Sequence, residues 1–169
     1  QDITFLWQPV ASVIEYNLQL SSPDFRNSTF FLDNVRISTD NYDITSLPEG
    51  EYSWRVRGEN NQGVTPYSTK KFIIDITPPN SPSLNLPINN TEVDLPVVLN
   101  WTVDESSNFD SLFIYSDSLI SPPILSLSHT DTEYIFSDSS EEEYFWRVRS
   151  QDEAGNTSEF TELRKFIIN

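Results

Sequence analysis

The sequence predicts an all-β chain made of two tandem antiparallel β-sandwich domains, over residues 1–76 and 77–169. Three observations lead to this prediction. A long motif is repeated within the chain, apolar and polar residues alternate inside that motif, and turn-forming residues recur about every dozen positions. Because no stretch has the apolar spacing of an amphipathic helix, the prediction contains strands only.

The internal repeat defines the domain organisation. The segment Glu51–Arg57 returns as Glu143–Arg149 at an offset of 92 residues, and Lys71–Asp75 returns as Lys165–Asn169 at an offset of 94. Matches at two separate places in the same order are typical of a duplicated structural unit. Each copy is therefore expected to fold as one domain.

Alternation within the repeat indicates half-buried strands. Between Tyr52 and Arg57, the apolar residues Tyr52, Trp54 and Val56 alternate with serine and arginine, a period of two that places them on one face of a strand. Turn-forming residues separate this run from others like it, at Ser22–Asp24, Asp40–Asn41, Pro48–Gly50, Asn60–Gly63 and Glu153–Asn156.

The two copies differ at their beginnings. Trp7 matches Trp101, but the second copy has a leader, Pro82–Asp94, before its tryptophan-bearing strand, and the first copy has none. We therefore expect the first sandwich to lack its opening strand. That strand lies upstream in the natural protein, or a partner chain supplies it by strand addition. The segment Asp75–Pro82, rich in proline, predicts a stiff and extended connector between the domains.

These motifs resemble fibronectin type III and immunoglobulin-like modules in their bacterial form. The resemblance is strongest to the tandem Trp-Arg-Val-Arg modules of Bacteroidetes surface lipoproteins, and it covers essentially the whole chain. It is carried by Trp7-Gln8-Pro9, by Trp101 and by the corner segment Leu47–Tyr52. In such folds the corner tyrosine donates a hydrogen bond to nearby backbone, a role that Tyr52 is placed to fill. The second copy departs from the pattern, because no Leu-Pro element precedes Tyr144.

Composition excludes several classes of partner. The chain carries 26 acidic and 10 basic residues, a net charge of −16, which disfavours nucleic acids and anionic lipid surfaces. It contains no cysteine, so it has no disulfide framework and no thiol chemistry. No apolar run approaches the ~20 residues that a membrane-spanning helix needs.

The sequence does not predict an enzyme. Acid–base or nucleophilic catalysis needs a base within hydrogen-bond reach of a nucleophile. The single histidine, His129, lies in a polar stretch, where it is expected on an exposed loop or an edge strand. No catalytic residue is proposed.

One loop carries a candidate metal site. Asp152, Glu153 and Asn156 supply the oxygen ligands that calcium prefers. The same residue types also form turns in the absence of metal, so calcium is the one cofactor that the sequence admits without requiring it.

Aromatic residues outside the inward strand phase are candidates for binding glycans. Phe25, Tyr67 and Phe160 are of this kind, although packing at strand edges explains them equally well. The resemblance to Bacteroidetes proteins also implies O-glycosylation at Asp-Ser-apolar motifs, which would place sugars on Ser111 and Ser118.

The function expected from these observations is that of a non-catalytic extracellular interaction or spacer module. The resemblance implies a bacterial surface protein or outer-membrane complex, with a protein partner on the cell envelope such as an outer-membrane barrel. The alternative is a glycan-binding accessory protein in polysaccharide capture. Function on such a fold depends on surface patches that are not recognisable in one sequence.

Overall fold

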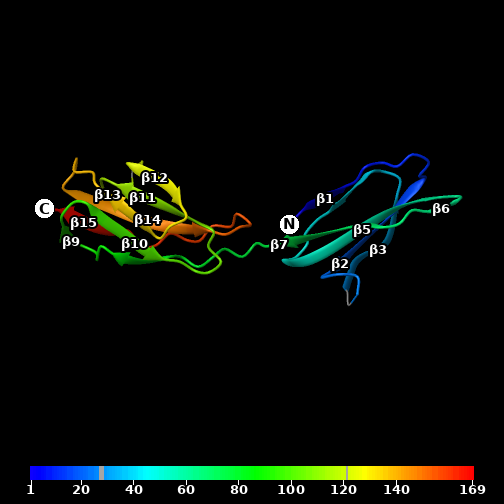
Figure 1. Cartoon of the computed structure of the whole chain (residues 1–169), viewed down its shortest axis with the longest axis horizontal. Helices are drawn as coiled ribbons and strands as arrows, with labels where there is room; N and C mark the ends of the chain where they lie inside the picture. Colours follow the sequence, from blue (N-terminus) through cyan, green and yellow to red (C-terminus); the bar gives the residue numbers. More distant parts are fainter. Residues whose placement is uncertain (27–28, 121) are drawn as a thin grey trace. The chain divides into compact units, whose positions relative to one another are not determined.

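The computed structural model describes residues 1–26, 29–120 and 122–169, and their regular structure consists of β-strands (Figure 1). The chain divides into two compact units, Gln1–Ile76 and Thr77–Asn169, called unit 1 and unit 2 below. No helix long and apolar enough to cross a membrane occurs in the described part of the chain.

Unit 2 is a sandwich of two sheets. One sheet has three strands, in the order β13 (Glu133–Phe136), β10 (Val97–Thr102), β8 (Ser83–Leu86). The other has five strands, in the order β12 (Leu125–His129), β11 (Phe109–Tyr115), β14 (Glu143–Gln151), β15 (Arg164–Ile168), β9 (Thr91–Val93). Neighbouring strands are antiparallel except β15 and β9, which run parallel.

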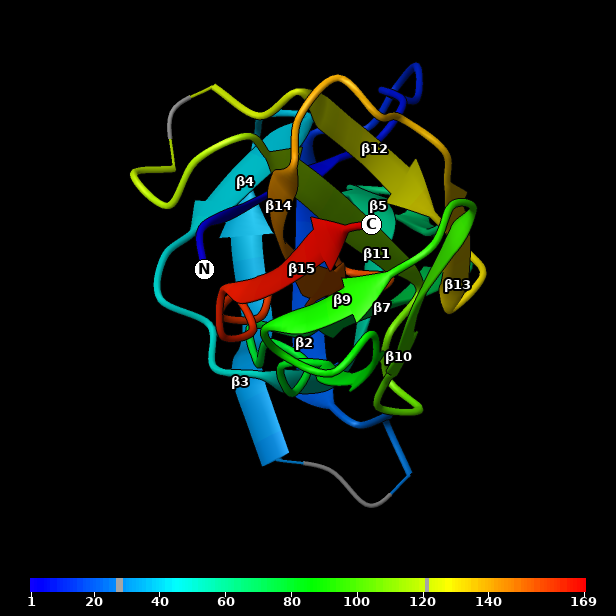
Figure 2. The same ribbon diagram turned by 90° about the vertical axis from the view of Figure 1, so that its left-hand side faces the viewer.

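The leader of unit 2 contributes to both sheets. Its first part, β8, pairs with β10, and its second part, β9, pairs with β15. Figure 2 shows β9, in green, running beside the red β15. The leader therefore closes one side of the sandwich.

Unit 1 contains the same framework without that closing segment. Its smaller sheet is the pair β1 (Ile3–Leu6) and β4 (Asn41–Ile44). Its larger sheet is centred on β5 and comprises β3 (Thr29–Ile37), β2 (Glu15–Ser22), β5 (Gly50–Asn60), β6 (Gly63–Val64) and β7 (Ser68–Ile74).

The repeat matches β1 to β10 and β7 to β15, but β8 and β9 have no counterpart in the described residues of unit 1. There, β1 pairs only with β4, and β7 pairs only with β5. The prediction that the first sandwich lacks its opening strand agrees with this topology. Two strand edges of unit 1 are consequently open.

Large aromatic side chains form both cores. In unit 2, Trp101, Trp146 and Phe166 are fully buried. Because each aromatic side chain buries a large apolar area, a few of them can form the core of a small sandwich. In unit 1, the ring of Tyr52 stacks on Phe72 with the centroids 5.2 Å apart. The alternation seen in the sequence thus corresponds to the inward faces of the strands.

The corner tyrosines make different hydrogen bonds in the two units. The hydroxyl of Tyr52 donates to the carbonyl oxygen of Pro48 at 2.8 Å, as the resemblance implies. In unit 2, the backbone N–H of Glu141 donates to the hydroxyl oxygen of Tyr144 at 3.0 Å. The difference follows from the loop, because unit 2 has no Leu-Pro element before this tyrosine.

Candidate interaction surfaces

The open side of unit 1 is hollowed into a groove of about 420 Å³. It lies between the end of β1 and the strand β7, and we call it the open groove. Its lining combines exposed indole surface with aliphatic and polar groups, from Leu6, Trp7, Gln8, Trp54, Val56, Ser68 and Lys70.

Residues at matched positions of the repeat differ in burial. Trp101 and Trp146 of unit 2 are fully buried, whereas their counterparts Trp7 and Trp54 are only partly buried. Leu84 of β8 lies opposite Trp101 and packs against the core of unit 2. The open groove is therefore the space that β8 covers in unit 2.

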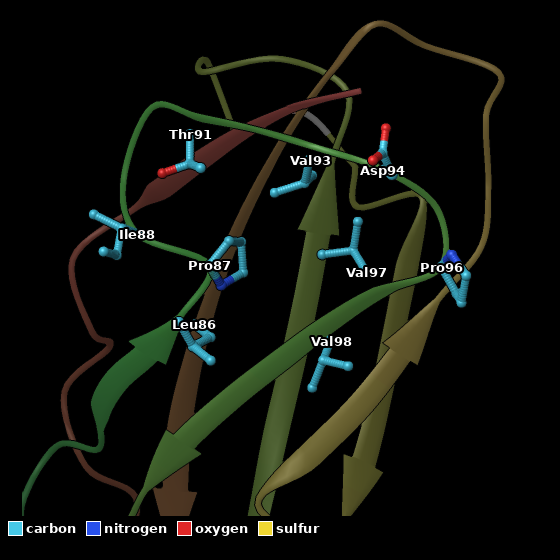
Figure 3. A pocket seen from close by; sticks show the side chains of 9 residues that line it. All are labelled: Leu86, Pro87, Ile88, Thr91, Val93, Asp94, Pro96, Val97 and Val98. Atoms are coloured by element: carbon cyan, nitrogen blue, oxygen red, sulfur yellow. The ribbon is translucent and has the colours of Figure 1, made fainter. Parts of the chain in front are cut away.

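Unit 2 has an apolar groove of about 330 Å³ between its leader and β10 (Figure 3). We call it the apolar groove. Figure 3 shows its side chains coming from β8, the turn after it, β9 and β10, with Pro87 between Leu86 and Ile88 at the switch from one sheet to the other. Leu86 is 52% exposed and Ile88 is 66% exposed.

Aliphatic exposure continues from the apolar groove onto the outer face of the three-stranded sheet. Val98 is 39% exposed and Ile135 is 59% exposed, and these two residues are direct cross-strand partners in β10 and β13. We call Leu86, Ile88, Val98 and Ile135 together the apolar face. A continuous exposed apolar surface of this kind marks a site of interaction more often than isolated residues do.

The outer face of the larger sheet carries arginine–aromatic stacks instead. In unit 1 the guanidinium of Arg55 lies 4.1 Å from the ring centroid of Phe25 and 4.3 Å from that of Tyr67. Arg57 lies 4.7 Å from the ring of Tyr67, whose hydroxyl donates to Asn17 at 2.9 Å. Contacts of this type stabilise the cation over the ring face.

Unit 2 repeats the arrangement around Phe160. The guanidinium of Arg147 lies 3.8 Å from its ring centroid, that of Arg149 lies 5.1 Å away, and Phe113 meets the ring edge-on at 5.4 Å. Of the three aromatic residues predicted to bind glycans, the structure thus brings Phe25 and Tyr67 together at one arginine and places Phe160 in the other unit. Each of the three rings has an arginine against it, and glycan binding there stays a prediction.

In the candidate calcium loop, the carboxylate of Asp152 accepts hydrogen bonds from within the loop. One oxygen accepts from the backbone N–H of Asn156 at 2.8 Å and the other from its side-chain amide at 2.9 Å. Desolvation of this buried carboxyl raises its pKa, but the hydrogen bonds from Asn156, Gly155 and Ala154 outweigh that effect, so the pKa of Asp152 is lowered.

The remaining predicted ligand, Glu153, is exposed on the loop. Among the described residues, no group of three or more histidine, cysteine, aspartate or glutamate side chains could hold a metal ion. The loop geometry is that of a capped turn, and calcium binding by Asp152, Glu153 and Asn156 stays a prediction.

The two predicted O-glycosylation sites differ in accessibility. Ser111 lies in the middle of β11, opposite Ser128 of β12 and Arg149 of β14. Ser118 is exposed in the turn after β11, beside Leu119, which is one of the most exposed apolar residues. Ser118 is therefore the more exposed of the two positions.

A buried carboxylate in unit 2 was not recognised from the sequence. Asp110 is buried and accepts hydrogen bonds from the indole N–H of Trp101 at 2.7 Å, from the hydroxyl of Ser150 at 2.7 Å and from that of Ser107 at 3.1 Å. The alternation in β11 could have indicated its burial, because Asp110 lies two residues before Leu112 and therefore on the same, inward face of the strand. Its donors come from three separate segments, which the sequence does not pair.

His129 ends the edge strand β12, one of the two positions expected from the sequence. Its Nδ1 atom lies 3.0 Å from the backbone nitrogen of Asp131, and its ring packs edge-on against Trp101 at 6.3 Å.

Neither family models nor curated protein sequences match the chain. Solved structures do match it. The fibronectin(III)-like modules of CbhA from Clostridium thermocellum give a TM-score of 0.57 at 14% identity, over 100% of this chain and 86% of that one. The FN1–FN3 domains of chicken CNTN1 give 0.52 at 13% identity, over 99% of this chain. The chain therefore has a fold similar to that of tandem fibronectin type III modules.

These similarities establish the fold and nothing finer. The chain spans 62% of the length of the CNTN1 structure that it matches. Identities of this size are compatible with unrelated functions on one fold. The function must therefore be argued from the surfaces of this chain.

Proposed function

We propose that the chain is a non-catalytic interaction module of a bacterial surface protein or outer-membrane complex, and that it contacts a protein partner through the apolar face of unit 2. The observation that carries this proposal is the position of Leu86, Ile88 and Val98 in the lining of the apolar groove, with Ile135 opposite Val98 on the next strand. Each of the four is at least 39% exposed.

The physical argument rests on what surrounds this face. A chain with a net charge of −16 has strong self-repulsion and high solubility. The apolar face carries four exposed aliphatic side chains, and Asp94 is the charged residue in the lining of the adjoining groove. Burying such a strip against a partner contributes ~25 cal/mol for each Å² of apolar area removed from water. Interface cores are typically apolar and poor in charge, with a polar rim.

The cellular setting follows from the resemblance of the sequence motifs. The Trp-Arg-Val-Arg modules that the chain resembles occur in Bacteroidetes surface lipoproteins, which supports an extracellular, envelope-associated location. A partner anchored in the outer membrane, such as a barrel protein, fits this setting. Tandem modules with a stiff connector also act as spacers, and this role is compatible with binding.

The experiment is isolation of the natively produced protein from cell envelopes in gentle detergent, comparing the wild-type chain with two variants. Val98→Glu places a charge on the apolar face, and Thr102→Glu places the same charge further along the outer face of the same strand. We expect a stoichiometric protein partner that Val98→Glu loses and Thr102→Glu retains. Recovery of the wild-type chain alone, or equal recovery of the partner with both variants, contradicts the proposal.

A further inference from the structure

A second hollow adjoins the apolar face of unit 2. It has a volume of about 430 Å³ and lies between the start of β12 and the end of β13, which are edge strands of different sheets. We call it the edge groove, and its lining includes Ile135 and Asp138. Val98, which lines the apolar groove, is the cross-strand partner of Ile135. A partner that covers the apolar face therefore meets a hollow on either side of one aliphatic pair.

Carboxylates border the apolar face. Asp94 lines the apolar groove, and Asp138 lines the edge groove. Glu133 lies two residues before Ile135 in β13, so both point to the outer face of the sheet, where both are exposed. The ion pairs found among the described residues involve none of these three carboxylates.

Basic residues do not offset these charges. Between Lys71 and Arg147 the sequence contains no lysine or arginine, and this stretch supplies all three strands of the smaller sheet. Arg164 reaches the leader, where its guanidinium donates to the carbonyl oxygen of Pro87 at 3.2 Å, but it is paired with Glu162 at 2.8 Å. The charges that border the apolar face are therefore negative, and such a surface attracts a cationic partner.

We propose that the partner of the apolar face is a protein segment whose aliphatic side chains are bordered by lysine or arginine. This inference rests on the proposed function and adds the chemistry of the partner. The aliphatic side chains cover Val98 and Ile135 and enter the two grooves, while the cations lie against Asp94, Glu133 and Asp138. A second copy of this chain does not fit, because its own face brings the same carboxylates into the contact.

The first test varies the salt concentration while the chain is isolated with its partner from cell envelopes. Between about 0.1 M and about 1 M NaCl the Debye length falls from ~10 Å to ~3 Å, which screens exposed charge pairs. Burial of the aliphatic side chains is not weakened by this screening. We expect the amount of partner retained to fall about fivefold or more over this range, as the loss of several exposed ion pairs implies.

The second test removes single charges with little change of shape. Asp94→Asn and Glu133→Gln are each expected to reduce retention about two- to fivefold at the lower salt concentration and to match wild type at the higher one. Glu159→Gln removes the same charge from an exposed position in the segment that leads into β15 and is the matched control. Asp138 is left unchanged, because its carboxylate also accepts the backbone N–H of Ser140 at 2.8 Å.

The outcomes separate this inference from the proposed function. If Val98→Glu loses the partner while salt, Asp94→Asn and Glu133→Gln have no effect, the apolar face is the binding site and a cationic partner is overturned. Equal losses with Glu159→Gln and Glu133→Gln also overturn it, because net charge alone then explains the result. If Val98→Glu retains the partner, or the wild-type chain is recovered alone, the proposed function fails and this inference fails with it.

Discussion

Leu84 lies directly opposite Trp101 in the β8–β10 pair, and Trp101 is fully buried beneath the leader of unit 2. Trp7, which the repeat matches to Trp101, lies in the open groove of unit 1 and remains partly exposed. The same residue at the same place in the fold thus has two environments. The difference comes from one segment of backbone, since the rest of the framework is shared.

The corner hydrogen bond of Tyr52 is expected to stabilise unit 1. Tyr52→Phe removes the hydroxyl that donates to Pro48 at 2.8 Å and leaves the ring stacked on Phe72. Loss of one such hydrogen bond costs ~1 kcal/mol, which for a domain of this size lowers the Tm by ~4–8 °C. Thermal unfolding followed by NMR signals of unit 1 measures this change.

Tyr42→Phe is the matched control for Tyr52→Phe. Tyr42 also packs against the core of unit 1, and its hydroxyl makes none of the hydrogen bonds described for the Tyr52 corner. We expect Tyr42→Phe to change the Tm by less than Tyr52→Phe does. Equal changes would indicate that packing, and not the corner hydrogen bond, sets the stability.

Asp110 is expected to be essential to the stability of unit 2. Asp110→Ala leaves the N–H of Trp101 and the hydroxyl of Ser150 buried without their acceptor, and each such loss costs ~1–3 kcal/mol. Urea unfolding should show the midpoint of unit 2 falling well below that of wild type. Asp131→Ala, at an exposed position, should leave the midpoint unchanged, and a similar loss in both variants would refute a specific role for the buried carboxylate.

The hydrogen bonds to Asp152 predict a pH-dependent contribution to stability. Because the folded state lowers the pKa of this carboxyl below its ordinary value of 3.8, the contribution is fully present above that value and disappears as the pH falls through the lowered one. The difference in unfolding free energy between wild type and Asp152→Ala should therefore be constant from about pH 5 to 7 and shrink below about pH 4. A difference that is constant down to pH 2 contradicts this assignment.

The two Asp-Ser-Leu motifs differ in exposure, so we expect glycosylation at Ser118 and not at Ser111. Ser118 lies in an exposed turn, whereas Ser111 lies within β11 between two paired strands. Peptide mass mapping of the natively produced chain should find sugar on Ser118, and Ser118→Ala should return the intact mass to that of the polypeptide. Sugar on Ser111, or an unmodified wild-type chain, is the contrary result.

Strand phase and the repeat predicted the framework well because both depend only on the order of residue types along the chain. Tyr52, Trp54 and Val56 point inward as their alternation indicates. The contact of Asp110 with Ser150 and the arginine contact of Phe160 could not be predicted, since each joins two strands or loops that the sequence does not pair.

The sequence also did not predict that the leader of unit 2 joins both sheets of the sandwich. The sequence shows Pro82–Asp94 as additional to the first copy, but nothing local distinguishes one strand from two short strands in different sheets. Pairing with β10 and then with β15 is decided by the edges that the rest of the sandwich leaves available.

Amide hydrogen exchange of the free chain at Ile73 and Ile167 tests most directly that unit 1 is open where unit 2 is closed. These residues are matched by the repeat, and Ile167 lies opposite Glu92 in the β15–β9 pair. In the alternating pattern of an antiparallel ladder, their N–H groups point away from β5 and β14, whereas that of Ile74 points toward β5. We predict rapid exchange at Ile73 and slow exchange at Ile167 and Ile74. Slow exchange at Ile73 equal to that at Ile74 would contradict an open edge on unit 1.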